Sequence, residues 1–503
     1  MSRTWINNDV RWWAIAASLL LSLLHALLNP MPNVDAFTYV RTAEVYLDQG
    51  LFAAFAWYPS ATYPLLIAGV HQLTGVNLFV SGQIINALIY ALLTFTFITL
   101  VMEIRRRAAT AGETDRLALI AAITVLVFPQ LNEYRYFLIR DIGAIAFLLL
   151  GLLQLMRVGR ERWLRHALLF GLFTLLAALF RAEALVYLLL GPCALLLNTR
   201  LERSSRVRQV LGILAVALLL MAVAIAASRV AGMDFPAVLE RVVAVYQPFI
   251  ASTTESLDGI NSPISEAVFG EYAADYSGQY IALFLVTGLA AILVLKLITG
   301  FGIPALLLIL QGLRTGSAQQ SNPAMRQAFL YASIAFLIML AFLLLTRFLS
   351  TRYTLMFCVT LMLMAPFVVD ALWQRTRAIR SLLLLVLLYC SVDAHISFGD
   401  SKESVQQASD WLVANTPADA AVVTNSTYLA YHSKRVPEYD RTSRYIDQET
   451  ILNAPFGTLL AFSLDRDVDA LLEHSLEFRR IELVRSFPEG GEPEFVIYRR
   501  LGN

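Results

Sequence analysis

A short acidic and aromatic stretch follows the first apolar segment of the sequence and contains side chains suited to proton transfer. It runs from residue 33 to residue 50 and includes Asp35, Tyr39 and Glu44. A carboxylate held beside a membrane surface can take a proton from a hydroxyl or amine group as that group attacks an electrophile. Tyr39 follows Asp35 by about one helical turn, so we expect the two side chains to share one face of a helix.

The apolar residues of this stretch predict an amphipathic helix. Phe37, Val40, Ala43 and Leu47 recur at helical spacing, while the charged side chains fall elsewhere on the helical wheel. Such a helix is expected to lie on the bilayer surface with its apolar face in the lipid. The alternative is an ordinary connector whose charged side chains face water.

A second group of candidate residues consists of arginines expected at the ends of membrane helices. Ionisable side chains at membrane depth are costly and usually face a cavity, and guanidinium groups bind phosphate through paired hydrogen bonds. These properties favour an anionic lipid head group as the ligand, with snorkelling or pairing to a nearby carboxylate as the alternatives. The arginines are Arg135, Arg140, Arg181, Arg347 and Arg352.

Together, these carboxylates and arginines suit glycosyl transfer from a lipid-linked sugar phosphate. The Asp35 carboxylate would take the acceptor proton while the acceptor attacks the anomeric carbon from the opposite side. The arginines would stabilise the phosphate that leaves on its polyprenyl chain, and this anionic leaving group needs no general acid. A single base and a single displacement imply inversion at the anomeric carbon.

The composition places these residues in an integral membrane protein. Of 503 residues, 58% are hydrophobic and only 15% are charged, which is too apolar for a soluble protein of this size. The net charge of +1 gives no indication of a nucleic-acid partner, and none is expected. The three cysteines all lie in apolar segments, which indicates buried thiols rather than a disulfide framework or a metal site.

Apolar segments of suitable length predict about eleven transmembrane helices in an α-helical polytopic protein. A helix needs about 20 apolar residues to cross a hydrocarbon core of about 30 Å. One long segment is interrupted by Gly300, Gly302 and Pro304 and is expected to be kinked. The expected spans are 12–28, 78–102, 117–130, 137–156, 167–180, 182–197, 210–227, 279–310, 328–346, 353–372 and 382–394.

The arginine distribution predicts the orientation of these spans. Four clusters, near residues 105–116, 157–165, 200–208 and 375–380, all fall on the side that the span count makes cytoplasmic. The N-terminus is therefore expected to be cytoplasmic, and the segments 29–77 and 231–278 are expected to be outer loops. We expect a multi-pass protein of the bacterial inner membrane.

The last part of the chain has a different character. The sequence predicts a transmembrane domain over residues 1–396 and a small extracytoplasmic α/β domain over residues 397–503, which would be periplasmic. Short apolar runs such as 421–424, 459–462, 480–484 and 495–498 alternate with helical patterns in this part. The expected roles of the domain are contact with an acceptor or partner, or covering the site.

Several short segments resemble one family along most of the chain. They are Asp35-Ala-Phe-Thr-Tyr39, Ala43-Glu-Val-Tyr-Leu-Asp-Gln-Gly50, Tyr63-Pro-Leu-Leu-Ile-Ala-Gly-Val, Thr74-Gly75, Arg352-Tyr353 and Ala408-Ser-Asp-Trp-Leu-Val-Ala-Asn-Thr-Pro. Their layout resembles the GT-C membrane glycosyltransferases, in the group of protein mannosyltransferases and bacterial aminoarabinose transferases. The resemblance implies a GT-C-like fold, a polyprenyl-phosphate-sugar donor, and a lipid, glycan or protein acceptor.

The resemblance also implies roles for individual residues. Asp35 corresponds to the catalytic base of the first outer loop, and Asp141 resembles the second outer-loop acid of the family. Ala36 stands where many relatives have a second acid, so no metal site is implied, although a divalent cation would be compatible with the family. The residues expected to contact substrate are Tyr39, Glu44, Tyr63, Arg135, Arg140, Arg181, Glu183, Arg347, Arg352 and Tyr353.

Two other classes of protein remain as alternatives. A transporter or lipid flippase is favoured by the interruption at residues 300–304, because transporters place their sites on broken helices. The gathering of polar residues at one membrane face is less typical of that class. An O-antigen ligase or polymerase also handles polyprenyl-linked sugars, but it depends less on an acid directly after the first span. The effect of changing Asp35 would therefore separate the alternatives.

Overall fold

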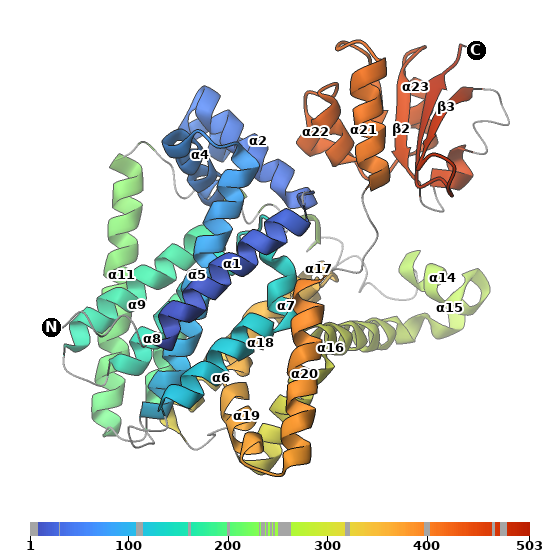
Figure 1. Ribbon diagram of the computed structural model, residues 1–503. Helices are drawn as coiled ribbons and strands as arrows, with labels where there is room; N and C mark the ends of the chain where they lie inside the picture. Colours follow the sequence, from blue (N-terminus) through green and yellow to red (C-terminus); the bar gives the residue numbers. More distant parts are fainter. Residues whose placement is uncertain are drawn as a thin grey trace. The chain divides into compact units, whose positions relative to one another are not determined.

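The computed structural model divides the chain into two units by its internal contacts. We call Met1–Leu28 with Val45–Ser397 the helical unit, and Asn29–Glu44 with Phe398–Asn503 the sheet unit (Figure 1). The sequence predicts a single break after residue 396; the contacts also join Asn29–Glu44 to the sheet unit. The structure describes residues 9–29, 31–106, 114–158, 162–198, 202–230, 263–316, 322–396, 403–464, 468–472 and 480–502, together with isolated positions between 232 and 249.

The described part of the helical unit consists of α-helices and short 3₁₀ helices. Most of the expected outer loop 231–278 lies outside the described residues, apart from isolated positions and α14 and α15. The elements are α1 (Val10–Leu28), α3 (Leu51–Trp57), α4 (Thr62–Thr74), α5 (Leu78–Arg106), α6 (Thr114–Val127), α7 (Pro129–Asn132), η3 (Glu133–Tyr136), α8 (Asp141–Arg157), α9 (Trp163–Phe180), α10 (Ala184–Leu190), η4 (Gly191–Leu197), α11 (Arg203–Val230), α14 (Pro263–Phe269), α15 (Glu271–Ser277), η5 (Gly278–Tyr280), α16 (Ile281–Thr315), α17 (Pro323–Thr346), η6 (Thr351–Thr354), α18 (Leu355–Met362), α19 (Ala365–Trp373) and α20 (Arg377–His395).

These helices confirm a polytopic membrane fold. Among the described residues, seven helices are long and apolar enough to cross a membrane, or up to nine if each of two bent pairs is one span. All eleven expected segments are largely helical, but α8 has 17 residues and Ala184–Leu197 is also short. The number of eleven crossings therefore stays a prediction.

Helix α8 lies at the centre of the helical unit. Almost every residue of α8 is buried, as expected for a helix that is apolar on all sides. It contacts α5 and α9 most extensively, and α1 lies beside α5 (Figure 1). Its first residue, Asp141, is an acid in the first turn, where the helix dipole favours a negative charge.

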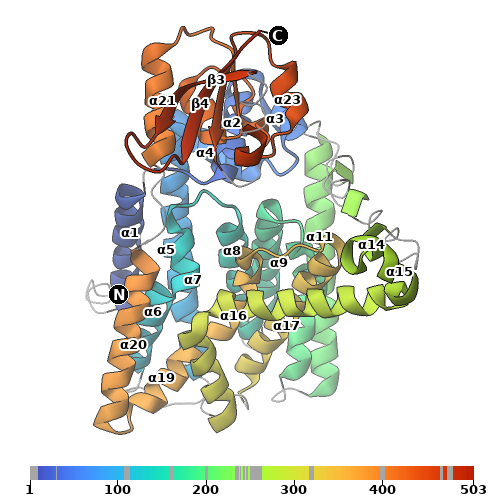
Figure 2. The same cartoon turned by 90° about the vertical axis from the view of Figure 1, so that its right-hand side faces the viewer.

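The interruption in α16 is a true break in the helix. Gly302 adopts φ 68° and ψ 153°, and Pro304 follows inside the element. Pro304 has no amide hydrogen to donate to the helix, and the Gly302 conformation suits only glycine. Figure 2 shows the two arms of α16 running in different directions. The predicted kink is confirmed.

The sheet unit contains a four-stranded sheet between two layers of helices (Figure 2). The strand order is β1-β2-β4-β3, with β1 and β2 parallel and the other neighbours antiparallel. The small α/β domain expected from the short apolar runs is therefore confirmed. The elements after residue 400 are α21 (Glu403–Asn415), β1 (Val422–Thr424), α22 (Thr427–Ser433), η7 (Tyr439–Arg441), α23 (Gln448–Asn453), β2 (Leu459–Ser463), β3 (Ile481–Phe487) and β4 (Phe495–Arg500).

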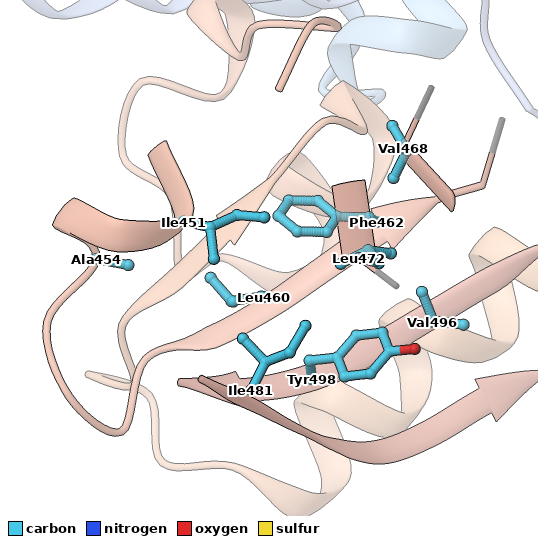
Figure 3. Close-up of a cluster of buried hydrophobic side chains, with 9 residues drawn as sticks. All are labelled: Ile451, Ala454, Leu460, Phe462, Val468, Leu472, Ile481, Val496 and Tyr498. Carbon is cyan, nitrogen blue, oxygen red and sulfur yellow. The ribbon is translucent and has the colours of Figure 1, made fainter. Parts of the chain in front are cut away.

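Alternate residues of the strands form the two cores of this unit. Leu460 and Phe462 of β2 pack with Ile451 of α23, whereas Leu459 and Ala461 pack with Leu412 of α21. Figure 3 shows the first of these clusters. A β-bulge between residues 483 and 485 shifts the register of β3. Because of this shift, the two ends of β3 contribute to opposite faces of the sheet.

The amphipathic helix expected after the first span is present as α2 (Val34–Gln49), but its apolar face is not exposed to lipid. Phe37 is 1% exposed, and its ring lies 5.5 Å from that of Tyr431 and 6.4 Å from that of Tyr439. The expectation that this face rests in the bilayer is therefore wrong. A protein surface rich in aromatic side chains takes the place of lipid.

Candidate functional site

Three helix termini bring the charged residues of the helical unit together. Asp141 begins α8, and Arg181 directly follows α9 in an extended conformation with φ −144° and ψ 118°. Glu183 immediately precedes α10, and the 3₁₀ helix η6 carries Arg352 and Tyr353. A charged group placed at a helix end keeps the helix interior apolar. This local sequence pattern therefore confines the polar groups to the ends of buried helices.

A close approach between two helices sets the geometry at Asp141. A Cβ atom added to Gly143 of α8 would lie 2.5 Å from the ring of Phe180, the last residue of α9. Only glycine therefore allows the end of α9 to reach the first turn of α8. Arg181 directly follows Phe180, so this contact places its guanidinium beside the Asp141 carboxylate.

Arg181 is held between two carboxylates. Its Nη1 donates to Oδ1 of Asp141, and its Nη2 donates to Oε1 of Glu183 at 2.8 Å. The Arg181 Cζ atom also lies 4.8 Å from the centre of the Tyr353 ring. The side chains of Arg181 and Asp141 are 19% and 7% exposed, so this ion pair is largely removed from water. Arg181 thus links α8, the α9–α10 junction and η6.

These residues help to line a cavity of about 90 Å³. Arg352 contributes a second guanidinium, whose Cζ lies 5.3 Å from the centre of the Tyr353 ring. The other walls are mostly apolar and include Leu148, Met339 and Phe342. Apolar walls with a few convergent charged groups are typical of binding sites for small molecules. This cavity would accept an anionic group attached to an apolar chain.

Two further predicted arginines lie at helix ends. Arg140 precedes α8, its Cζ lies 5.7 Å from the centre of the Tyr58 ring, and its positive charge also acts on Glu183. Arg347 directly follows α17 and has a left-handed backbone, φ 55°. This conformation is uncommon for residues other than glycine and typically costs about 1 kcal/mol or more. Neither side chain lines the cavity described above.

Arg135 and Tyr63 are parts of buried networks. Arg135 is 3% exposed; it donates to Oδ1 of Asn132 at 2.6 Å and to the hydroxyls of Ser18 and Ser22 at 3.1 Å and 2.9 Å. Tyr63 is fully buried and donates to Oδ1 of Asn86 at 2.7 Å. These contacts join α1 to η3 and α4 to α5. The structure gives both residues a role in packing helices, and neither lines the cavity.

The remaining predicted residues belong to the sheet unit. Asp35, Tyr39 and Glu44 lie on the first part of α2, which is joined to the C-terminal residues by its contacts. Asp35 is partly exposed and Tyr39 is 4% exposed. Glu44 accepts a hydrogen bond from the Tyr439 hydroxyl at 2.8 Å. Glu44 therefore orients a neighbouring side chain.

The sequence did not indicate the apolar part of the cavity. Tyr187 of α10 follows Glu183 by one helical turn, and Met339 and Phe342 are three residues apart on α17. Such spacings are common in any apolar helix, so they carry no distinct signal.

Among the described residues, no group of three or more histidine, cysteine, aspartate or glutamate side chains could hold a metal ion.

The polytopic helical fold of this chain is similar to that of a solved oligosaccharyltransferase. The oligosaccharyltransferase AglB from Archaeoglobus fulgidus, solved with an inhibitory peptide and a dolichol-phosphate, aligns with 92% of this chain and 70% of its own, at 12% identity and a TM-score of 0.50. ArnT from Cupriavidus metallidurans, solved with undecaprenyl phosphate, covers 97% of both chains at 12% identity and a TM-score of 0.49. No protein-family model and no curated protein matches the sequence.

Proposed function

We propose that this protein is a membrane glycosyltransferase that moves a sugar from a polyprenyl-phosphate-linked donor to a lipid, glycan or protein acceptor. The observation that carries the proposal is the cavity at the helix ends, where Arg181 and Arg352 meet walls of apolar side chains. Its fold neighbour AglB has been solved with a dolichol-phosphate, which combines a phosphate with an apolar chain. The cavity and the fold therefore support the same class of ligand.

Arg352 is the proposed contact to the donor phosphate. A guanidinium can offer two parallel hydrogen bonds to phosphate oxygens, and the negative charge on these oxygens grows as the bond to the sugar breaks. Arg140 and Arg347 are proposed to support the same anionic group from neighbouring helix ends. The Tyr353 ring contacts both the Arg181 and the Arg352 guanidinium groups, so we propose that it helps to hold them at the cavity.

Asp35 is the proposed general base. It would accept the proton of the acceptor group during attack on the anomeric carbon, and the departing polyprenyl phosphate would need no proton. The bond from the acceptor to the anomeric carbon forms as the bond from that carbon to the phosphate oxygen breaks. A single displacement of this kind inverts the configuration of the sugar.

Asp141 takes a different proposed role from the one implied by the sequence resemblance. Its carboxylate is buried and already accepts a hydrogen bond from Arg181, so it is engaged within the protein. We therefore propose that Asp141 and Glu183 orient Arg181, which in turn supports the ring of Tyr353. The two carboxylates would also balance the positive charge of the site before the donor arrives.

The proposal is tested with purified protein in lipid nanodiscs. Undecaprenyl phosphate should bind and raise the melting temperature, whereas undecaprenol, which has the same chain without the phosphate, should not. Undecaprenyl-phosphate-linked hexoses and pentoses are then added with membranes of the source organism, and released undecaprenyl phosphate is measured by mass spectrometry. Equal binding of the alcohol and the phosphate would overturn the phosphate site. Movement of the intact lipid across liposomes without release of phosphate would instead identify a transporter.

The proposed location is the bacterial inner membrane, with the N-terminus in the cytoplasm and the sheet unit in the periplasm. Alkaline phosphatase is active only after export, so a fusion after residue 503 should be active. A fusion within the arginine-rich segment near residue 375 should be inactive. The opposite pattern would reverse the proposed orientation.

A further inference from the structure

Within the sheet unit, the first part of α2 packs against the C-terminal residues through an aromatic contact. The Phe37 ring lies 6.2 Å from that of Tyr428 on α22, in addition to its contacts with Tyr431 and Tyr439. Tyr431 and Tyr439 also contact each other, with ring centres 4.9 Å apart. A single buried phenyl ring therefore sits among three tyrosines from α22 and η7. Aromatic pairs of this kind typically contribute about 0.5–1.5 kcal/mol each beyond the burial of their area.

A polar contact lies about two turns further along the same helix. The Tyr439 hydroxyl donates to Oε2 of Glu44 at 2.8 Å, and Nη1 of Arg41 lies 3.2 Å from the same oxygen. The Cζ atom of Arg41 lies 5.9 Å from the centre of the Tyr439 ring. Burial and the Glu44 carboxylate raise the pKa of the Tyr439 hydroxyl, which keeps it a donor throughout the physiological pH range.

The geometry of an α-helix places these contacts on one face of α2. At about 100° per residue, Phe37, Arg41 and Glu44 fall within about 60° of one another around the helix axis. Asp35 and Tyr39 are about 160° or more from Phe37, and they lie close together on the opposite face. One face of α2 therefore contacts α22 and η7, and the other carries the proposed base and its neighbour.

We propose that the C-terminal part of the sheet unit, residues 398–503, is a positioning element for Asp35, acting through Phe37 and through the hydrogen bond from Tyr439 to Glu44. This inference rests on the proposed glycosyltransferase function. Two contacts seven residues apart fix both the rotation of α2 about its axis and its position along that axis. Asp35 is rigidly connected to them by the helix. Tyr439 and Glu44 are thus positioning residues that do not need to touch the substrate.

The test compares Tyr439→Phe, Glu44→Gln and Glu44→Ala with wild-type full-length protein. Hydrogen–deuterium exchange of the α2 amides 36–44 should increase in Tyr439→Phe and Glu44→Ala. The kcat of donor consumption should fall about 10- to 100-fold, because small misplacements of a catalytic group have effects of this size. The KM for the undecaprenyl-phosphate-linked donor should stay within about twofold, since the cavity of the helical unit is unchanged.

Glu44→Gln retains an oxygen that can accept from Tyr439, so it should preserve more activity than Glu44→Ala. Tyr445→Phe is the matched control: Tyr445 is 88% exposed, and its substitution should change neither exchange nor kcat. The double variant Tyr439→Phe/Glu44→Gln should be no less active than Tyr439→Phe alone, because both changes weaken the same contact.

The two proposals fail in different ways. Unchanged exchange in α2 and unchanged kcat in Tyr439→Phe and Glu44→Ala would overturn the positioning role. A loss of kcat without faster exchange would also overturn it, because the helix would then not be held by this contact. Full activity of Asp35→Asn would reject the proposed base, whereas the exchange measurement would still report on the docking of α2.

Discussion

Gly143 and Phe180 touch so closely that no side chain larger than hydrogen fits between them, since a Cβ atom at position 143 would lie 2.5 Å from the phenyl ring. This contact joins the start of α8 to the end of α9, one residue before Arg181. The positions of Asp141 and Arg181 therefore depend on a residue that has no functional group of its own.

Gly143→Ala is expected to weaken both stability and donor binding. Overpacking of a tight contact typically costs about 1–3 kcal/mol and would push Arg181 away from Asp141. The melting temperature in nanodiscs and the affinity for undecaprenyl phosphate would both decrease. Gly69→Ala on α4 is the control, because a Cβ atom there meets nothing within 4 Å. Equal behaviour of the two variants would contradict the role of the Gly143–Phe180 contact.

Asp35→Asn is expected to abolish transfer while insertion into the membrane and binding of undecaprenyl phosphate stay intact. Loss of a general base typically reduces the rate by about 10²- to 10⁴-fold. The measurement is kcat for release of undecaprenyl phosphate, together with the melting temperature with and without that lipid. Full activity of the purified variant would remove Asp35 from the mechanism.

Arg352→Ala and Arg140→Ala are expected to bind donor more weakly. A charge-assisted hydrogen bond is typically worth about 1.5–3 kcal/mol, which corresponds to a loss of affinity of about 10- to 150-fold. Arg352→Lys should recover part of the loss, because lysine keeps the charge but not the paired geometry. Titration of each variant with undecaprenyl phosphate gives the affinities. Wild-type affinity in both alanine variants would disprove the phosphate contact.

Arg135→Ala is expected to lower stability with little effect on donor affinity. The substitution removes the donor to Ser18, Ser22 and Asn132, and unsatisfied buried polar groups typically cost about 1–3 kcal/mol each. The thermal unfolding of the variant and its affinity for undecaprenyl phosphate are measured at a temperature where it is folded. If affinity fell while the melting temperature stayed constant, Arg135 would belong to the binding site after all.

The sequence predicts where the helices and strands lie more fully than it predicts which residues they contact. Alternating and short apolar runs locate β2, β3 and β4, and the Gly300–Pro304 segment locates the break in α16. These features depend on local rules for strands and helix breaks. The number of membrane crossings is less local, because bent pairs and short helices can be counted in more than one way.

The roles of individual site residues could not be predicted, because their contact partners are distant in the sequence. Arg135 and Arg352 are both arginines near helix ends, but the hydroxyl partner of Arg135, on Ser18, is 117 residues away. Likewise, the periodicity of α2 reveals an apolar face without showing whether lipid or protein covers it. The contact between Tyr439 and Glu44 spans 395 residues, and no local pattern indicates it.

The docking of α2 has a practical consequence for dissecting the protein. A recombinant fragment that starts at residue 398 lacks Phe37, so the rings of Tyr428, Tyr431 and Tyr439 would meet water and the fragment should tend to aggregate. Joining residues 29–44 to such a fragment through a flexible linker would restore the missing helix. The sheet unit is therefore discontinuous in sequence, with its two pieces separated by more than 350 residues of the helical unit.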